Sequence, residues 1–359
     1  DQTNTANVSN TVKSEASTGG NNADFNTGGS TVIKTGDATN VVDVENKINS
    51  NKAVIEDCGD CDGTANIDIK DNGAFSLNQA EVVSNKENVL VQDNDANVNN
   101  YVKAESETGD NSAGYGTNGD SAIITGDAKT IVGVDNNVNK NTAVIAGSEA
   151  GIGDGSSAKI VGNGAFSLNG IGIENNSAVV IAQENDAYIK NKVKADAETG
   201  ENAIDFTTGG EAVIVTGDAK TKVIVENDVN FNIASVDCDC LLEDFDVKIG
   251  GNGADSFNGV EAANNSALEV LAANNADLYN KTNADAETGE NGAGYNVGYE
   301  GSGDPTIVTG DAVSVTEVSN NANTNVAEQG GLLGFPEGVD FSFEFDFSSL
   351  FGGLFESGN

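Results

Sequence analysis

The chain has 359 residues, of which 57 are acidic and 17 are basic, so its formal net charge at pH 7 is −40. Every basic residue is lysine, and arginine, histidine, tryptophan and methionine do not occur in the sequence. So acidic a surface repels nucleic acid and anionic lipid, and without histidine there is no imidazole to activate a nucleophile or to bind a metal.

The N-terminal stretch has the pattern of a strand rather than of a leader. The chain starts at Asp1 without an apolar signal-like region, which is typical of a processed, exported protein, so we expect an extracellular or cell-surface location. From Ala6 to Val12 small apolar residues alternate with polar ones, and this period of two predicts a β-strand. Asn10 lies on the apolar side of that pattern.

A second strand pattern follows the tetrapeptide TGDA at Thr35–Ala38. Its alternate residues are Val42, Val44, Asn46 and Ile48, so an asparagine again lies among apolar side chains. Burying an amide without a hydrogen-bond partner costs about 1–3 kcal/mol. We therefore expect Asn46 to have a partner that its own strand cannot supply.

Both strand patterns recur along the chain, together with three short markers. TGDA begins at Thr35, Thr125, Thr216 and Thr309, in steps of 90, 91 and 93 residues. A TGxN marker begins at Thr18, Thr108, Thr199 and Thr288, and the segment NGAFSLN or NGADSFN begins at Asn72, Asn163 and Asn252. The recurring asparagines are Asn10, Asn100, Asn191 and Asn280 in the first strand, and Asn46, Asn136, Asn227 and Asn320 in the second. The shared period predicts four repeats of about 90 residues that occupy residues 1–328.

The four cysteines form two close pairs, Cys58 with Cys61 and Cys238 with Cys240, and each pair follows the second strand of its repeat. In an exported protein such pairs favour disulfides within or between subunits. A zinc site of four thiolates and free thiols are the alternatives, although the C-x-C spacing matches zinc knuckles poorly. The acidic loops lack the EF-hand and β-roll spacings, so we expect no cofactor beyond weakly bound calcium.

Residues 329–359 depart from the repeat and form a tail rich in glycine and phenylalanine. Phe341, Phe343, Phe345 and Phe347 alternate there with serine and acidic residues, which predicts a strand with one strongly apolar face. Such a strand either caps the last repeat of its own chain or docks on the next subunit. No polar cap precedes the N-terminal strand, and uncapped solenoid ends favour polymerisation.

Two all-β architectures could use a repeat of this kind. In a chain of separate β-sandwiches, each asparagine needs its own hydrogen-bond partner within its own domain. In a β-solenoid of stacked β-arches, equivalent strands lie parallel and in register about 4.8 Å apart, so that each asparagine lies over its copy and the amides bond along the stack. One residue type at one inward position in every repeat, in a core of small residues, favours the solenoid with asparagine ladders.

We therefore expect a non-enzymatic, secreted structural protein that self-assembles into an extracellular filament, tube or cell sheath. Its main partner would be itself, with other cell-envelope components as further partners. The competing class is a monomeric adhesin-type or ligand-binding solenoid at the cell surface, and a carbohydrate-active β-helix enzyme is a third class. The scattered acidic residues form no recognisable catalytic pair, and no apolar run of 18 residues predicts a membrane span.

The inward asparagine rows, the glycine-rich turns, the paired cysteines and the near absence of proline resemble extracellular amyloid-like and solenoid proteins. Among these, the chain is similar over most of its length to the amyloid-like proteins that build tubular sheaths around chains of methanogenic archaea. That likeness is one of composition and ladder-type repeats, without a diagnostic motif. It implies a β-strand protein that self-associates into hoops or tubes and resists protease and detergent. Curlin repeats are less similar, because they are far shorter and carry a paired glutamine ladder.

Overall fold

The computed structural model describes residues 1–55, 65–146, 157–237, 246–298 and 304–329, and every regular element within these ranges is a β-strand. One set of long strands consists of β1 (Gln2–Ser17), β5 (Leu77–Glu107), β10 (Leu168–Glu198) and β15 (Phe257–Glu287). They form a parallel sheet in the order β1-β5-β10-β15, the forward sheet. The return sheet is also parallel and consists of β3 (Ala38–Ile55), β8 (Ala128–Ala146), β13 (Ala219–Asp237) and β18 (Ala312–Gln329).

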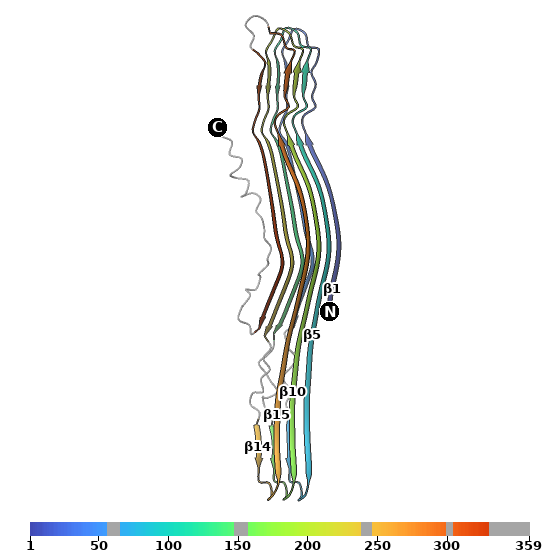
Figure 1. Cartoon of the computed structure of the whole chain (residues 1–359), viewed down its shortest axis with the longest axis vertical. Helices are drawn as coiled ribbons and strands as arrows, with labels where there is room; N and C mark the ends of the chain where they lie inside the picture. Colours follow the sequence, from blue (N-terminus) through green and yellow to red (C-terminus); the bar gives the residue numbers. More distant parts are fainter. Residues whose placement is uncertain (56–64, 147–156, 238–245, 299–303, 330–359) are drawn as a thin grey trace.

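Short strands complete each turn of the coil. Before the return strands lie β2 (Thr31–Lys34), β7 (Ser121–Ile124), β12 (Ala212–Val215) and β17 (Thr306–Val308). After the forward strands lie β6 (Ser112–Gly114), β11 (Ala203–Asp205) and β16 (Gly292–Gly294), and after the return strands lie β4 (Asn66–Lys70), β9 (Ser157–Val161) and β14 (Asp246–Gly250). The chain thus runs out along the forward sheet and back along the return sheet (Figure 1). We number these turns as rung 1 (β1–β4), rung 2 (β5–β9), rung 3 (β10–β14) and rung 4 (β15–β18).

Neighbouring rungs are aligned residue for residue. Asn10 pairs with Asn100, and the same parallel register continues through Asn191 to Asn280. Identical residue types therefore lie over one another at the strand spacing of about 4.8 Å. This arrangement confirms the predicted all-β solenoid of stacked arches and rules out separate sandwiches. Every pairing between described strands is parallel and joins different rungs, so none of them is a hairpin.

The core lies between the two sheets as alternating apolar and amide layers. One apolar layer stacks Val102 and Val134 with their copies in neighbouring rungs, and another contains Val98 and Val138. The row of Asn100 separates these two layers along the strand. Two sheets packed face to face are only about 10 Å apart, so a core of valine, alanine and asparagine fills the space without large aromatic side chains.

A kink in the return strands shifts the inward face by one residue. The residues at the kink have left-handed backbone φ angles of 56° to 62° and are Asn49, Asn139, Asn230 and Asn323. The regular strand pairing omits this position between Ile48 and Ser50. In rung 1 the buried position before the kink is Asn46, and after it the buried position is Asn51. The period-two pattern therefore changes phase within one strand, as at a β-bulge.

Two groups of predicted residues lie outside the described ranges. They are the cysteines Cys58, Cys61, Cys238 and Cys240 and the tail residues Phe341, Phe343, Phe345 and Phe347. The disulfide, zinc and tail-docking alternatives therefore stay predictions.

Candidate functional site

The predicted asparagines meet in the core as two facing rows. Asn100 Nδ2 donates to Oδ1 of Asn191 in the next rung at 2.8 Å and to Oδ1 of Asn136 in the opposite sheet at 2.9 Å. Asn136 Nδ2 donates in turn to Oδ1 of Asn227 at 2.7 Å. These four side chains are at most 2% exposed, and each amide has its partners within the ladder. The prediction that Asn46 and its copies stack is confirmed.

Both rows have the same direction. In the forward sheet each Nδ2 donates to the Oδ1 of the following rung, at 2.8, 2.8 and 2.7 Å, through Asn10, Asn100, Asn191 and Asn280. In the return sheet each step is 2.7 Å, through Asn46, Asn136, Asn227 and Asn320. Among the described residues nothing accepts from Asn320 Nδ2 in rung 4, and nothing donates to Asn10 Oδ1 in rung 1. Each ladder therefore has an acceptor end at rung 1 and a donor end at rung 4.

Sequence reasoning missed further asparagine rows with buried inner members. Two of them face one another across the core: Asn4, Asn94, Asn185 and Asn274 in the forward sheet, and Asn51, Asn141, Asn232 and Asn325 in the return sheet. Two others follow the kink residues Asn49, Asn139, Asn230 and Asn323 and the TGxN residues Asn21, Asn111, Asn202 and Asn291. The row of Asn51 lies beyond the kink, where the inward face changes phase, so the pattern that contains Asn46 does not extend to it. The signal that could have found it is the N-x-N sequence at residues 49–51, which recurs in all four repeats.

A glutamine row lies beside these asparagines and runs in the opposite direction. Gln183 Nε2 donates to Gln92 Oε1 at 2.8 Å, and Gln92 Nε2 donates to Gln2 Oε1 at 2.7 Å. The equivalent position in rung 4 is Ala272, so this row ends at rung 3. The facing asparagine rows, by contrast, continue through all four rungs.

Aromatic rings stack at the turns that follow the forward strands. Phe25, Tyr115, Phe206 and Tyr295 have ring centroids 4.7, 5.2 and 4.9 Å apart and nearly parallel planes. All four have left-handed backbone, with φ from 54° to 60°, a conformation that costs a bulky residue about 1 kcal/mol or more. The rings of the end residues, Phe25 and Tyr295, are 75% and 79% exposed, against 50% and 46% for the inner two. One ring face is therefore open at each end of the stack.

Glycines mark the closest approach between rungs. A Cβ at Gly109 would lie 2.0 Å from the carbonyl oxygen of Gly200, and a Cβ at Gly200 would lie 2.0 Å from that of Gly289. At Gly289 itself a Cβ would meet nothing within 4 Å, because no described rung follows it. At the glycines of TGDA the close contact is with the preceding rung instead of the following one. A Cβ at Gly126 would meet the backbone of Gly36, and a Cβ at Gly36 would meet no described residue within 4 Å.

Carboxylates also stack, on the outer faces of the sheets. Glu107, Glu198 and Glu287 occupy equivalent positions at the ends of their forward strands. Partial burial, together with the negative charges of Glu201 and Glu107, raises the pKa of Glu198 to about 7. Two like charges about 4.8 Å apart repel by about 1 kcal/mol even in water. The charged rows therefore oppose the stacking that the amide rows favour.

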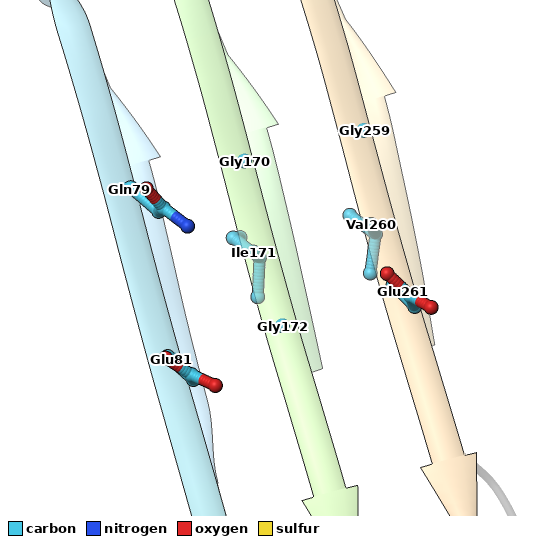
Figure 2. A pocket seen from close by; sticks show the side chains of 8 residues that line it. All are labelled: Gln79, Glu81, Gly170, Ile171, Gly172, Gly259, Val260 and Glu261. Carbon is cyan, nitrogen blue, oxygen red and sulfur yellow. The ribbon is translucent and has the colours of Figure 1, made fainter.

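A shallow hollow of about 460 Å³ lies on the outer face of the forward sheet. Its floor is β10 at Gly170 and Gly172, which have no side chains (Figure 2). Gln79 and Glu81 of β5 line it on one side, and Glu261 of β15 lines it on the other. The backbone of these strands is already paired within the sheet, so recognition of a ligand would depend on one amide and two carboxylates.

No helix in the described part of the chain is long and apolar enough to cross a membrane. Within the same ranges, no group of three or more acidic side chains is arranged to hold a metal ion. Comparison with known proteins finds no matching family model, no similar curated protein and no similar solved structure.

Proposed function

We propose that the chain is a secreted structural protein, without enzymatic activity, that self-assembles into an extracellular filament, tube or cell sheath. The observation that carries this proposal is that the stack runs on to an open edge at both end rungs. The main forward and return strands and the asparagine rows of the inner rungs continue into rungs 1 and 4, and each of these rungs has one edge without a strand partner among the described residues. Open, regular sheet edges are templates for pairing with another chain.

The interior of the stack supports a structural task. Parallel, in-register strands, dry amide ladders and small interdigitated side chains are the features that give cross-β assemblies their resistance to unfolding. The acidic outer rows keep such edges soluble at low ionic strength, and screening by salt would weaken that repulsion. Assembly should therefore increase with salt concentration.

The tail is the second element that we assign to assembly. Phe341, Phe343, Phe345 and Phe347 lie outside the described ranges, so this part of the proposal rests on their alternation with polar residues in the sequence. A strand with one strongly apolar face suits docking on the next subunit.

Electron microscopy of the purified full-length protein in negative stain tests the proposal. We expect polymers with a β-strand repeat of about 4.8 Å along their length, which fibre diffraction would record. Short rods of uniform length at every salt concentration and pH would contradict self-assembly.

The second candidate is a monomeric ligand-binding module at the cell surface, and the observation that favours it is the glycine-floored hollow. Glu81 and Glu261 on its rim suit a cationic or polyhydroxylated ligand. Screening an oligosaccharide array with the wild-type protein and with Glu81→Gln tests this candidate. Binding that the substitution abolishes, by a protein that stays monomeric, would favour it over assembly.

A further inference from the structure

We propose that copies of this chain join head to tail, with rung 4 of one copy docked on rung 1 of the next in the register that already relates neighbouring rungs. This inference rests on the proposed self-assembly and specifies its interface. In that register Asn280 of one copy lies against Asn10 of the next, and Asn320 lies against Asn46. The partner is therefore a second copy of the same chain, and the contact repeats the one that joins rungs inside the molecule.

The direction of the amide ladders selects this orientation. At the donor end, Asn280 Nδ2 uses one N–H on Asn320 Oδ1 at 3.0 Å and has a second N–H to give to another rung. At the acceptor end, Asn10 Oδ1 receives no hydrogen bond from the described residues. Docking rung 4 on rung 1 joins donors to acceptors, whereas rung 1 against rung 1 joins acceptors to acceptors. Two copies related by a two-fold axis therefore leave the buried amides unpaired, which is costly.

The strand directions and the aromatic rows agree with the same orientation. A two-fold axis would make the joined strands antiparallel, but every pairing inside the chain is parallel. Head-to-tail docking also places the open ring face of Tyr295 on the open face of Phe25 in the next copy, which continues the aromatic stack. A contact between two different faces does not close on itself by symmetry, so it produces filaments, or rings where the rotation closes.

Two glycines test the interface without disturbing the fold. Among the described residues of one copy, a Cβ at Gly289 meets nothing within 4 Å, but the row of Gly19, Gly109 and Gly200 shows that it would meet the carbonyl of a following rung at about 2.0 Å. A Cβ at Gly36 is equally free, but its copies in rungs 2 to 4 approach the preceding rung at 2.5, 2.5 and 2.3 Å. Gly289→Ala therefore blocks the rung 4 face, and Gly36→Ala blocks the rung 1 face.

Gly170→Ala is the matched control. Gly170 lies in an inner rung, and a Cβ there meets nothing within 4 Å, so this alanine blocks neither end. Circular dichroism and melting temperature of the three variants verify that the fold is unchanged. Sedimentation velocity then gives the size distribution of each variant under conditions in which the wild-type chain forms polymers.

The two end variants should each stay monomeric, while Gly170→Ala should polymerise like the wild type. A mixture of equal amounts gives the sharper result. The free rung 4 face of the Gly36→Ala chain docks on the free rung 1 face of the Gly289→Ala chain, and both outer faces of that dimer are blocked. We therefore expect dimers and no longer species in the mixture.

The failures of the two proposals have different signatures. A wild-type chain that stays monomeric at every salt concentration and pH overturns the proposed self-assembly. A wild-type chain that polymerises, with end variants that polymerise to the same extent, overturns the head-to-tail interface and leaves self-assembly standing. The same holds if the end variants are monomeric but their mixture contains no dimer.

Discussion

The inner rungs 2 and 3 and the outer rungs 1 and 4 have nearly the same residues, but their side chains have different environments. Asn136 and Asn227 are 0% exposed, whereas Asn10 is half-buried and Asn320 is exposed. A methyl group has no room at Gly109 and open space at Gly289. In a stacked fold, a neighbouring rung rather than the residue type determines whether a side chain is buried. The same substitution can therefore be compared at an inner and at an outer rung.

The largest difference in stability between the same substitution at an inner and at an outer rung is expected at the glycines of the TGxN turn. Gly109→Ala places a methyl group 2.0 Å from the carbonyl oxygen of Gly200, so rungs 2 and 3 must separate at that turn. We expect a loss of about 2–4 kcal/mol in the free energy of unfolding, and Gly289→Ala should change it by less than about 0.5 kcal/mol. Denaturant unfolding of the monomeric proteins measures both values. Equal losses at the two positions would contradict the close contact.

The asparagine ladder should show a smaller difference of the same kind. Asn136→Ala removes one hydrogen-bond partner from each of the buried amides of Asn46 and Asn227, and we expect a loss of about 1–3 kcal/mol in the free energy of unfolding. Asn320→Ala removes an exposed member and should cost less than about 1 kcal/mol in the monomer. Thermal melting of the two variants beside the wild type gives the comparison. A change within error at Asn136 would mean that its amide is replaced by water.

The stacked carboxylates should give a smaller, pH-dependent effect. Because burial and the neighbouring carboxylates raise the pKa of Glu198 to about 7 from an ordinary 4.5, the folded chain binds more protons than the unfolded chain between these values. The free energy of unfolding therefore falls as the pH rises from about 4.5 to 7. Glu198→Gln should remove that part of the fall, about 1 kcal/mol after allowing for solvent screening. Melting temperatures of the wild type and of Glu198→Gln, measured from about pH 4.5 to 7, test this prediction. If both melting temperatures fall equally with pH, groups other than Glu198 cause the pH dependence.

Removing the tail should change assembly with the least change in stability. Deleting residues 340–359 removes Phe341, Phe343, Phe345 and Phe347 but none of the described rungs. We expect an unchanged melting temperature and a much lower yield of polymer in a sedimentation assay. Normal fibres from the shortened chain would remove the tail from the mechanism, and a higher yield would mean that it caps rung 4 of its own chain.

Much of this fold follows from the sequence. The shared period of the TGDA and TGxN markers defines the repeat, and the alternation around Asn10 and Asn46 defines the two main strands and their inward faces. A buried amide needs a partner, and only stacking of equivalent strands supplies the same partner four times. The parallel, in-register arrangement is therefore determined by the residues themselves.

Other features were decided by the tertiary structure. The kink at Asn49 changes the inward face, so the second ladder at Asn51 depends on a left-handed backbone angle that no periodicity of two contains. The direction of the ladders and the open space at Gly36 and Gly289 are properties of contacts between rungs 90 residues apart in sequence. The sequence states which residue occupies each position. Which residue lies over it in the next rung, and which positions at the two ends have no such neighbour among the described residues, is decided only when the chain folds.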